Sequence, residues 1–189
     1  SVSGAKGDGA DVFQCQPISL GESTSCSFQL LWDGSANGFS GELADGIMLG
    51  APVSGGEPPA PTSTPSPTPS PTPSPGGGGS AIYVSAAAGG NAGGVAYDDV
   101  DILKFDVSSG AWSLFFDGSD VGLVASSNHD IRAFDVLDDG SMLFSVVGST
   151  TLPDIGAIDD SDIVRFEPTS MGSDTAGAFT FYLDGSDVG

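Results

Sequence analysis

The chain has 189 residues, enough for one moderate hydrophobic core or two small ones, so its size does not require disulfides or metals for stability. Its 25 acidic and 4 basic residues give a formal net charge of −21, while 39% hydrophobic residues are typical of a folded chain. Without a basic patch or an apolar run near the roughly 20 residues that cross a bilayer, the composition argues against nucleic-acid binding and membrane insertion, and it favours cationic partners such as calcium.

The first unit that we expect covers residues 1–53. Cys15 and Cys26 lie there, and their separation of 26 − 15 = 11 positions suits the two arms of a β-hairpin. We therefore predict a disulfide rather than a metal pair, and with it a secreted protein. The chain opens at Ser1 without a signal-peptide pattern, which we interpret as a mature, processed or excerpted chain.

A low-complexity linker is expected over residues 54–80. Proline at nearly every second position from Pro58 to Pro75 predicts a polyproline II rod of roughly 55 Å, at about 3.1 Å per residue. The rod interrupts a predicted hairpin, so the strand that begins near Ala81 could pair with another subunit. Its hydroxyls are typical of O-glycosylated stalks, with an unmodified spacer as the alternative. The candidate sites are Thr62, Ser63, Thr64, Ser66, Thr68, Ser70, Thr72 and Ser74.

Residues 81–189 are expected to hold the remaining repeat units. Period-2 alternation predicts strands at 101–107, 111–117, 130–137 and 141–147. Asp-Gly and Ser-Gly sequences between them favour tight turns, and no stretch has a convincing helical pattern.

Internal repeats are the clearest feature of the sequence. Residues 99–105 recur as 160–166, an offset of 160 − 99 = 61, and the match extends back without gaps to Ser80 and Ser141. The phrase Asp-Gly-Ser-Asp-Val-Gly follows both copies, but at an offset of 67, so a hairpin between them is longer by 67 − 61 = 6 residues.

A third copy lies at the N-terminus, where residues 11–38 align with 162–189 at a constant offset of 151. The chain is therefore predicted to be all-β, made of tandem four-stranded antiparallel units that are propeller-blade-like and do not close into a ring. An array of β-sandwiches is the alternative. We expect the last two strands to be left as an open pair.

Aspartates recur at fixed positions of the repeats and are candidate calcium ligands, because calcium prefers carboxylate and carbonyl oxygens. Solvated carboxylates that only stabilise turns are the alternative. The candidates are Asp99, Asp101, Asp117, Asp120, Asp160, Asp162, Asp184 and Asp187.

Enzymatic constellations are not evident, and we expect no catalytic activity. The one histidine, His129, has no Gly-x-Ser-x-Gly sequence to accompany it, and zinc or redox centres would need more Cys and His ligands. An aromatic sugar platform would instead make the chain a carbohydrate- or cell-surface-binding module, although core packing explains the same residues. These are Trp32, Trp112, Phe115, Phe116, Phe179, Phe181 and Tyr182.

The phrases Asp-x-Asp-Ile-x-x-Phe and Trp-Ser-Leu-Phe-Phe-Asp-Gly-Ser-Asp-Val-Gly resemble tandem repeats of uncharacterised bacterial secreted and surface proteins. The resemblance implies extracellular display and a β-repeat fold, and it implies no catalysed reaction. The N-terminal copy departs from it by having Ala36-Asn37 where Asp120-Val121 stand, which puts a metal site there in doubt. The proline-rich segment is similar to glycosylated segments of microbial extracellular filaments.

Exposed strand edges pair readily with other chains, and a heterologous contact that does not close makes fibres. We therefore expect a structural subunit of an extracellular filament, whose partners are copies of itself in a helical or head-to-tail polymer and covalent glycans.

Overall fold

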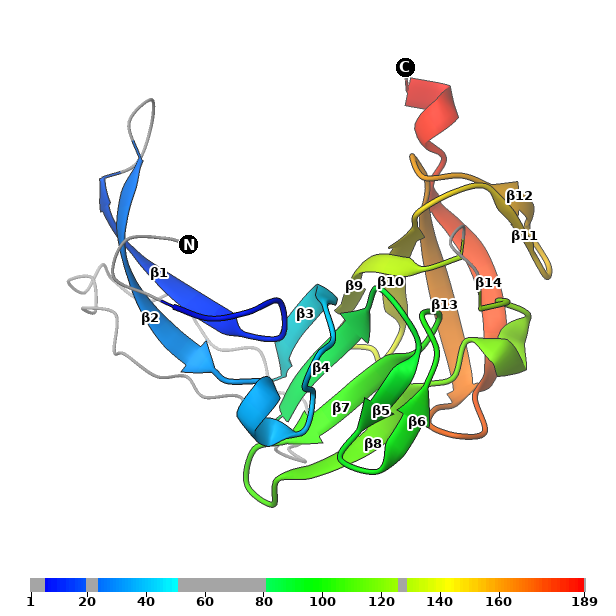
Figure 1. Cartoon of the computed structure of the whole chain (residues 1–189). Coiled ribbons are helices and arrows are strands. Elements are labelled where there is room, and N and C mark those ends of the chain that lie inside the picture. Colours follow the sequence, from blue (N-terminus) through cyan, green and yellow to red (C-terminus); the bar gives the residue numbers. More distant parts are fainter. Residues whose placement is uncertain (1–5, 20–23, 51–80, 126–128, 189) are drawn as a thin grey trace, which may run out of the picture.

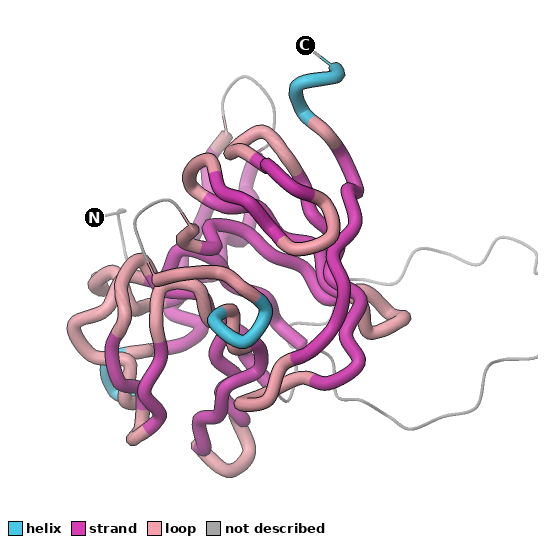
Figure 2. Tube along the Cα trace, turned by 90° about the vertical axis from the view of Figure 1, so that its right-hand side faces the viewer, coloured by secondary structure: helices cyan, strands magenta, loops and turns pink. Residues whose placement is uncertain are grey.

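A computed structural model describes residues 6–19, 24–50, 81–125 and 129–188. Strands dominate these residues, and the helical elements among them are three short 3₁₀ turns (Figure 2). The sheets are antiparallel, hold two or four strands each, and none closes into a barrel or ring. The predicted all-β, unclosed architecture is confirmed. The expected linker at 54–80, with its candidate glycosylation sites, lies outside the described residues.

The N-terminal sheet is a two-stranded hairpin of β1 (Val12–Ser19) and β2 (Ser25–Trp32). A disulfide joins Cys15 to Cys26 across it, with the two Cα atoms 5.4 Å apart, so the predicted bridge is confirmed. The hairpin projects from the rest of the molecule (Figure 1).

The first four-stranded sheet has the order β3-β4-β7-β8: β3 (Ala44–Gly50), β4 (Ala81–Ala86), β7 (Ile102–Asp106) and β8 (Ala111–Phe116). Strand β3 precedes the proline-rich segment and β4 follows it, and the two pair from Ala44–Ala86 to Gly50–Ala81. The strand that begins at Ala81 therefore pairs within its own chain, and the expectation that it seeks another subunit is wrong for this structure.

The second four-stranded sheet has the order β14-β13-β10-β9: β9 (Ile131–Val136), β10 (Met142–Val146), β13 (Ile163–Ser170) and β14 (Ala176–Leu183). Because β13 pairs with β10, the last two strands are not the open pair that we expected. Of the three strand pairs that begin a repeat, β1–β2 is the one that forms a two-stranded sheet in the described part of the chain. Each four-stranded sheet thus combines two strands from one sequence repeat with two from the next.

Two small hairpins were not predicted. They are β5 (Gly90–Ala92) with β6 (Val95–Tyr97), and β11 (Thr150–Leu152) with β12 (Gly156–Ile158). The first turn, Gly93-Gly94, has positive φ at both residues, as a tight two-residue hairpin requires, whereas the second turn has one residue more.

That extra residue corrects the repeat alignment. Ile82 pairs with Phe105 and Met142 pairs with Phe166, so the offset in the preceding strand is 142 − 82 = 60 rather than 61. A gapless alignment would have turned every side chain of that strand to the wrong face.

Two hydrophobic cores lie between successive sheets. In the first, Trp32 of β2 packs on Phe105 and Trp112 of the next sheet, with ring centroids 5.7 and 5.8 Å apart. In the second, Phe116 of β8 packs on Phe166 of β13 at 5.2 Å. The sheets therefore follow one another in a row, joined face to face.

The two four-stranded sheets also meet at one edge, where β3 lies beside β9. The backbone amide of Val136 donates to the Met48 sulfur at 3.3 Å across this contact. Sheets that pack face to face and share an inner edge are arranged like neighbouring propeller blades.

Candidate functional site: turn carboxylates and the open ends of the row

Asp101 is a buried carboxylate that holds two loops together. Its Oδ2 accepts the backbone amide of Asp98 at 2.8 Å, and its Oδ1 accepts that of Gly118 at 2.9 Å. A Cβ at position 118 would lie 2.3 Å from the Val100 carbonyl oxygen, so glycine is required for this approach. Burial raises the pKa of Asp101 above its usual value despite these hydrogen bonds.

The same arrangement recurs one repeat later. Asp162 accepts the amides of Asp159 and Gly185 at 2.8 and 2.9 Å. In the N-terminal copy Asp11 accepts the amide of Asp8 at 2.9 Å. The recurrent Asp and the glycine of Asp-Gly-Ser therefore form a clamp, which accounts for their repetition without a ligand.

The aspartates of the Asp-Gly-Ser phrases stabilise the 3₁₀ turns η2 (Ser119–Val121) and η3 (Gly185–Val188). Asp117 Oδ1 accepts the Ser119 hydroxyl at 2.7 Å, and Asp184 Oδ1 accepts the Ser186 hydroxyl at 2.6 Å. Both carboxylates also accept the backbone amide of their serine at 3.1 Å. This is the turn chemistry that Asp favours.

Asp120 acts between sheets. Its Oδ2 accepts the backbone amide of Thr175 at 2.8 Å, and the Thr175 hydroxyl in turn accepts the amide of Asp117 at 2.9 Å. Gly172 donates its amide to the Phe115 carbonyl at 2.9 Å. These contacts, which we call the latch, fix the β13–β14 turn to the end of β8, and the six-residue extension of this hairpin makes them possible.

The remaining calcium candidates lie apart from a common centre. Asp99 lies next to Asp130, Asp160 is exposed in the loop before β13, and Asp187 is exposed in η3. Within the described ranges, no three His, Cys, Asp or Glu side chains converge on a point that could hold a metal ion. Calcium binding by the chain stays a prediction.

A carboxylate cluster that the sequence analysis missed lies where β3 meets β9. Asp130 is 8% exposed, and Asp45, Asp99 and Arg132 are its charged neighbours. Burial, together with the nearby carboxylates, raises the pKa of Asp130 to about 7. The repeat comparison could not reveal this cluster, because Asp45 and Asp130 come from segments that only the packing of two sheets brings together.

The aromatic residues proposed as a sugar platform are divided between core and surface. Trp32, Trp112, Phe116 and Phe179 are at most 9% exposed, so they pack in the cores as the alternative interpretation expected. The indole of Trp112 also donates to the Asn37 carbonyl at 2.6 Å. Phe181 and Tyr182 remain exposed at 39% and 60%.

His129 has a local role. Its Nδ1 accepts the backbone amide of Val124 at 2.9 Å and so closes a loop. In the part of the chain described by the structure, no helix is long and apolar enough to cross a membrane. The disulfide is compatible with an extracellular location.

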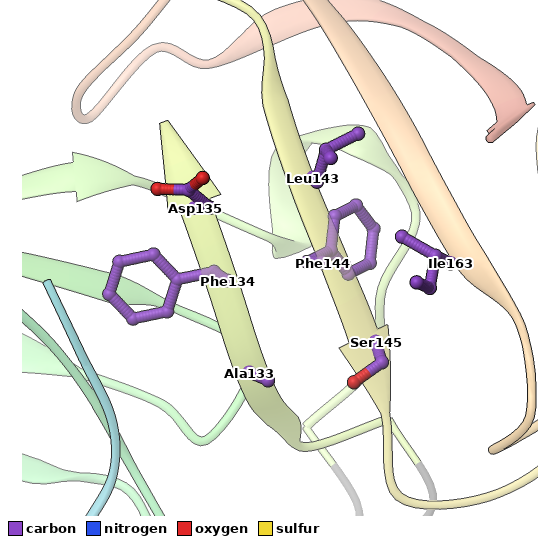
Figure 3. Close-up of a pocket in the computed structure, with 7 residues that line it drawn as sticks. All are labelled: Ala133, Phe134, Asp135, Leu143, Phe144, Ser145 and Ile163. Atoms are coloured by element: carbon purple, nitrogen blue, oxygen red, sulfur yellow. The ribbon is translucent and has the colours of Figure 1, made fainter. Parts of the chain in front are cut away.

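The far face of the last sheet carries a pocket of about 250 Å³ that Leu143, Ser145 and Ile163 help to line. Figure 3 shows Leu143 and Ile163 on the neighbouring strands β10 and β13. The lining is mostly apolar and holds one carboxylate, Asp135. Its residue types suit packing against another apolar surface better than acid–base chemistry.

Comparison of the chain with protein-family models, with curated proteins and with solved structures finds no match. The resemblance to bacterial surface repeats therefore stays a prediction.

Proposed function

We propose that this protein is a structural subunit of an extracellular filament or surface fibre, assembled through the unpaired ends of its row of sheets. One observation carries the proposal. Strands β7 and β13 pair with β4 and β10 on one side, but β1, which occupies the same place in the repeat, has β2 as its one strand partner among the described residues. The other edge of β1 is thus available to a strand from another copy.

The two ends of the row differ, which determines the kind of assembly. One end is the hairpin β1–β2, and the other is the complete sheet that ends with β14. A contact between different surfaces of identical copies repeats indefinitely unless its rotation closes a ring. The proposed subunit therefore adds head to tail.

Three further features belong to this proposal. The Pro/Ser/Thr segment would carry O-linked glycans outward from the fibre, calcium would reduce repulsion among the carboxylates, and the disulfide would protect the exposed hairpin outside the cell.

Negative-stain electron microscopy of the purified chain, with and without a calcium chelator, tests the proposal. We expect regular fibres. Fibres that persist after chelation would retain the structural role and remove calcium from it, whereas isolated particles in both conditions would rule the role out. A periodate-reactive stain of the intact chain, compared with a chain lacking residues 58–75, tests for glycans separately.

A further inference from the structure

Inside the chain, two sheet surfaces pack against each other and are buried. Copies of these two surfaces lie exposed at the two ends of the row of sheets. Inside, the side chains of β13–β14 that face the preceding sheet are Val164, Phe166 and Phe179, and they are 0%, 0% and 3% exposed. They pack on a surface that includes Ile102 and Phe116, both 0% exposed.

The N-terminal hairpin carries the first of these surfaces again. The offset of 151 places Phe13, Cys15 and Phe28 at the positions of Val164, Phe166 and Phe179, and both hairpins have the same bulges. Phe13 and Phe28 are half-buried and Cys15 is exposed, whereas their three counterparts are buried. We call this surface, with Cys26, the front face.

The last sheet carries the second surface again. Ile163 and Leu183 stand at the positions of Ile102 and Phe116, as their pairing shows. Leu183 is 38% exposed where Phe116 is fully buried, and Tyr182 beside it is 60% exposed. With Leu143 they form what we call the back face, over the pocket shown in Figure 3.

We infer that the front face of one copy packs on the back face of the next, reproducing between chains the contact that β13–β14 makes with β8 inside the chain. The inference rests on the proposed function and specifies its interface. We assign the back face to a second copy of the chain, because each copy also carries a front face whose apolar residues match it. The match is one of size and polarity: Phe13, Phe28 and the disulfide meet Ile163, Tyr182 and Leu183.

Polar groups of the latch repeat in the same register. Asp187 occupies the position of Asp120, and Thr24 that of Thr175. The carboxylate of Asp187 is therefore placed to receive an amide of the next copy's hairpin. Because each copy carries a net charge of −21, long-range repulsion opposes the contact, and added salt strengthens association.

Two variants test the interface: Phe28→Asp on the front face and Leu183→Asp on the back face. Leu49→Asp is the matched control, since Leu49 is a strand leucine, 50% exposed, that belongs to neither face. Circular dichroism and thermal unfolding establish that each variant folds. Sedimentation velocity over a range of concentrations should show polymers for the wild type and the control, and association weaker by about tenfold or more for each face variant.

Mixing the two face variants gives the sharper test. Phe28→Asp keeps a back face and Leu183→Asp keeps a front face, so each alone should be monomeric and an equimolar mixture should give 1:1 dimers and nothing longer. Dimers of either variant alone would overturn the inference, since they require a symmetric contact. Fibres unchanged in both variants would also overturn it and leave the filament role to the β1 edge. A wild type that stays monomeric would overturn both proposals and assign the faces to other partners.

Discussion

Thr175 donates its backbone amide to the carboxylate of Asp120 at 2.8 Å, although the two residues lie 55 positions apart. The contact joins the turn of one sheet to the 3₁₀ turn of the sheet before it. Thr175 is 4% exposed, and its hydroxyl bonds both the Asp117 amide and the Gly172 carbonyl. A single buried threonine therefore links consecutive repeats.

Replacing Thr175 by valine should lower the free energy of unfolding by about 1–3 kcal/mol, because the half-buried Asp117 amide and Gly172 carbonyl lose the hydroxyl that bonds them. Urea denaturation measures this. Thr180→Val, at an exposed position of the same hairpin, should change stability by less than about 0.5 kcal/mol. Equal effects of the two substitutions would argue against the latch.

Asp101→Asn and Asp162→Asn should each destabilise the fold by about 1–3 kcal/mol, because one side of the asparagine amide presents donors to backbone amides that need an acceptor. Hydrogen exchange provides a local readout: the amides of Gly118 and Gly185, respectively, should lose protection. Asp160→Asn, at an exposed carboxylate, is the control. If Gly118 exchange is unchanged in Asp101→Asn, the clamp does not hold that amide.

Removing the disulfide in the double variant Cys15→Ser, Cys26→Ser should destabilise the β1–β2 hairpin by about 3 kcal/mol, the amount expected for closing a loop of this length. Amide exchange should accelerate in β1 and β2, while the second core around Phe116 and Phe166 keeps its protection. The unreduced wild type is the reference. Uniform loss of protection throughout the chain would show that the hairpin does not unfold separately.

The stability of the protein should fall as the pH rises from about 4 to about 7. Burial and nearby carboxylates raise the pKa of Asp130 from 3.8 to about 7, so within this range the folded chain keeps a proton that the unfolded chain releases. Asp130→Asn should remove this part of the slope and raise the melting temperature at pH values above about 7. Asp138→Asn, in an exposed turn, should leave the slope unchanged. Thermal unfolding at four pH values is the measurement.

Tryptophan fluorescence should not respond to sugars, because both indoles are packed in the core between β2 and the next sheet. Titration with monosaccharides and oligosaccharides should leave the emission maximum and intensity unchanged. A saturable shift would favour the carbohydrate-binding alternative. Guanidinium-unfolded protein is the positive control for a change in emission.

Hairpins, turns and the repeat could be predicted from the sequence, because they depend on neighbours along the chain. Alternation of apolar side chains identified strands such as β7 and β8, and the spacing of Cys15 and Cys26 identified a bridge across one hairpin. The small hairpins β5–β6 and β11–β12 escaped prediction because three-residue strands are too short for an alternation pattern.

Which strands share a sheet was decided only by the tertiary structure. In a repeated sequence, any strand can be taken as the first strand of the unit. Local patterns therefore cannot show that β13 pairs with β10 or that β3 pairs with β4 across the proline-rich segment. The roles of the aspartates followed from the same packing. Asp101 and Asp162 were candidate metal ligands because they recur at fixed repeat positions, and only the close approach of a loop and a glycine turn showed that they accept backbone amides, since a buried amide requires a partner.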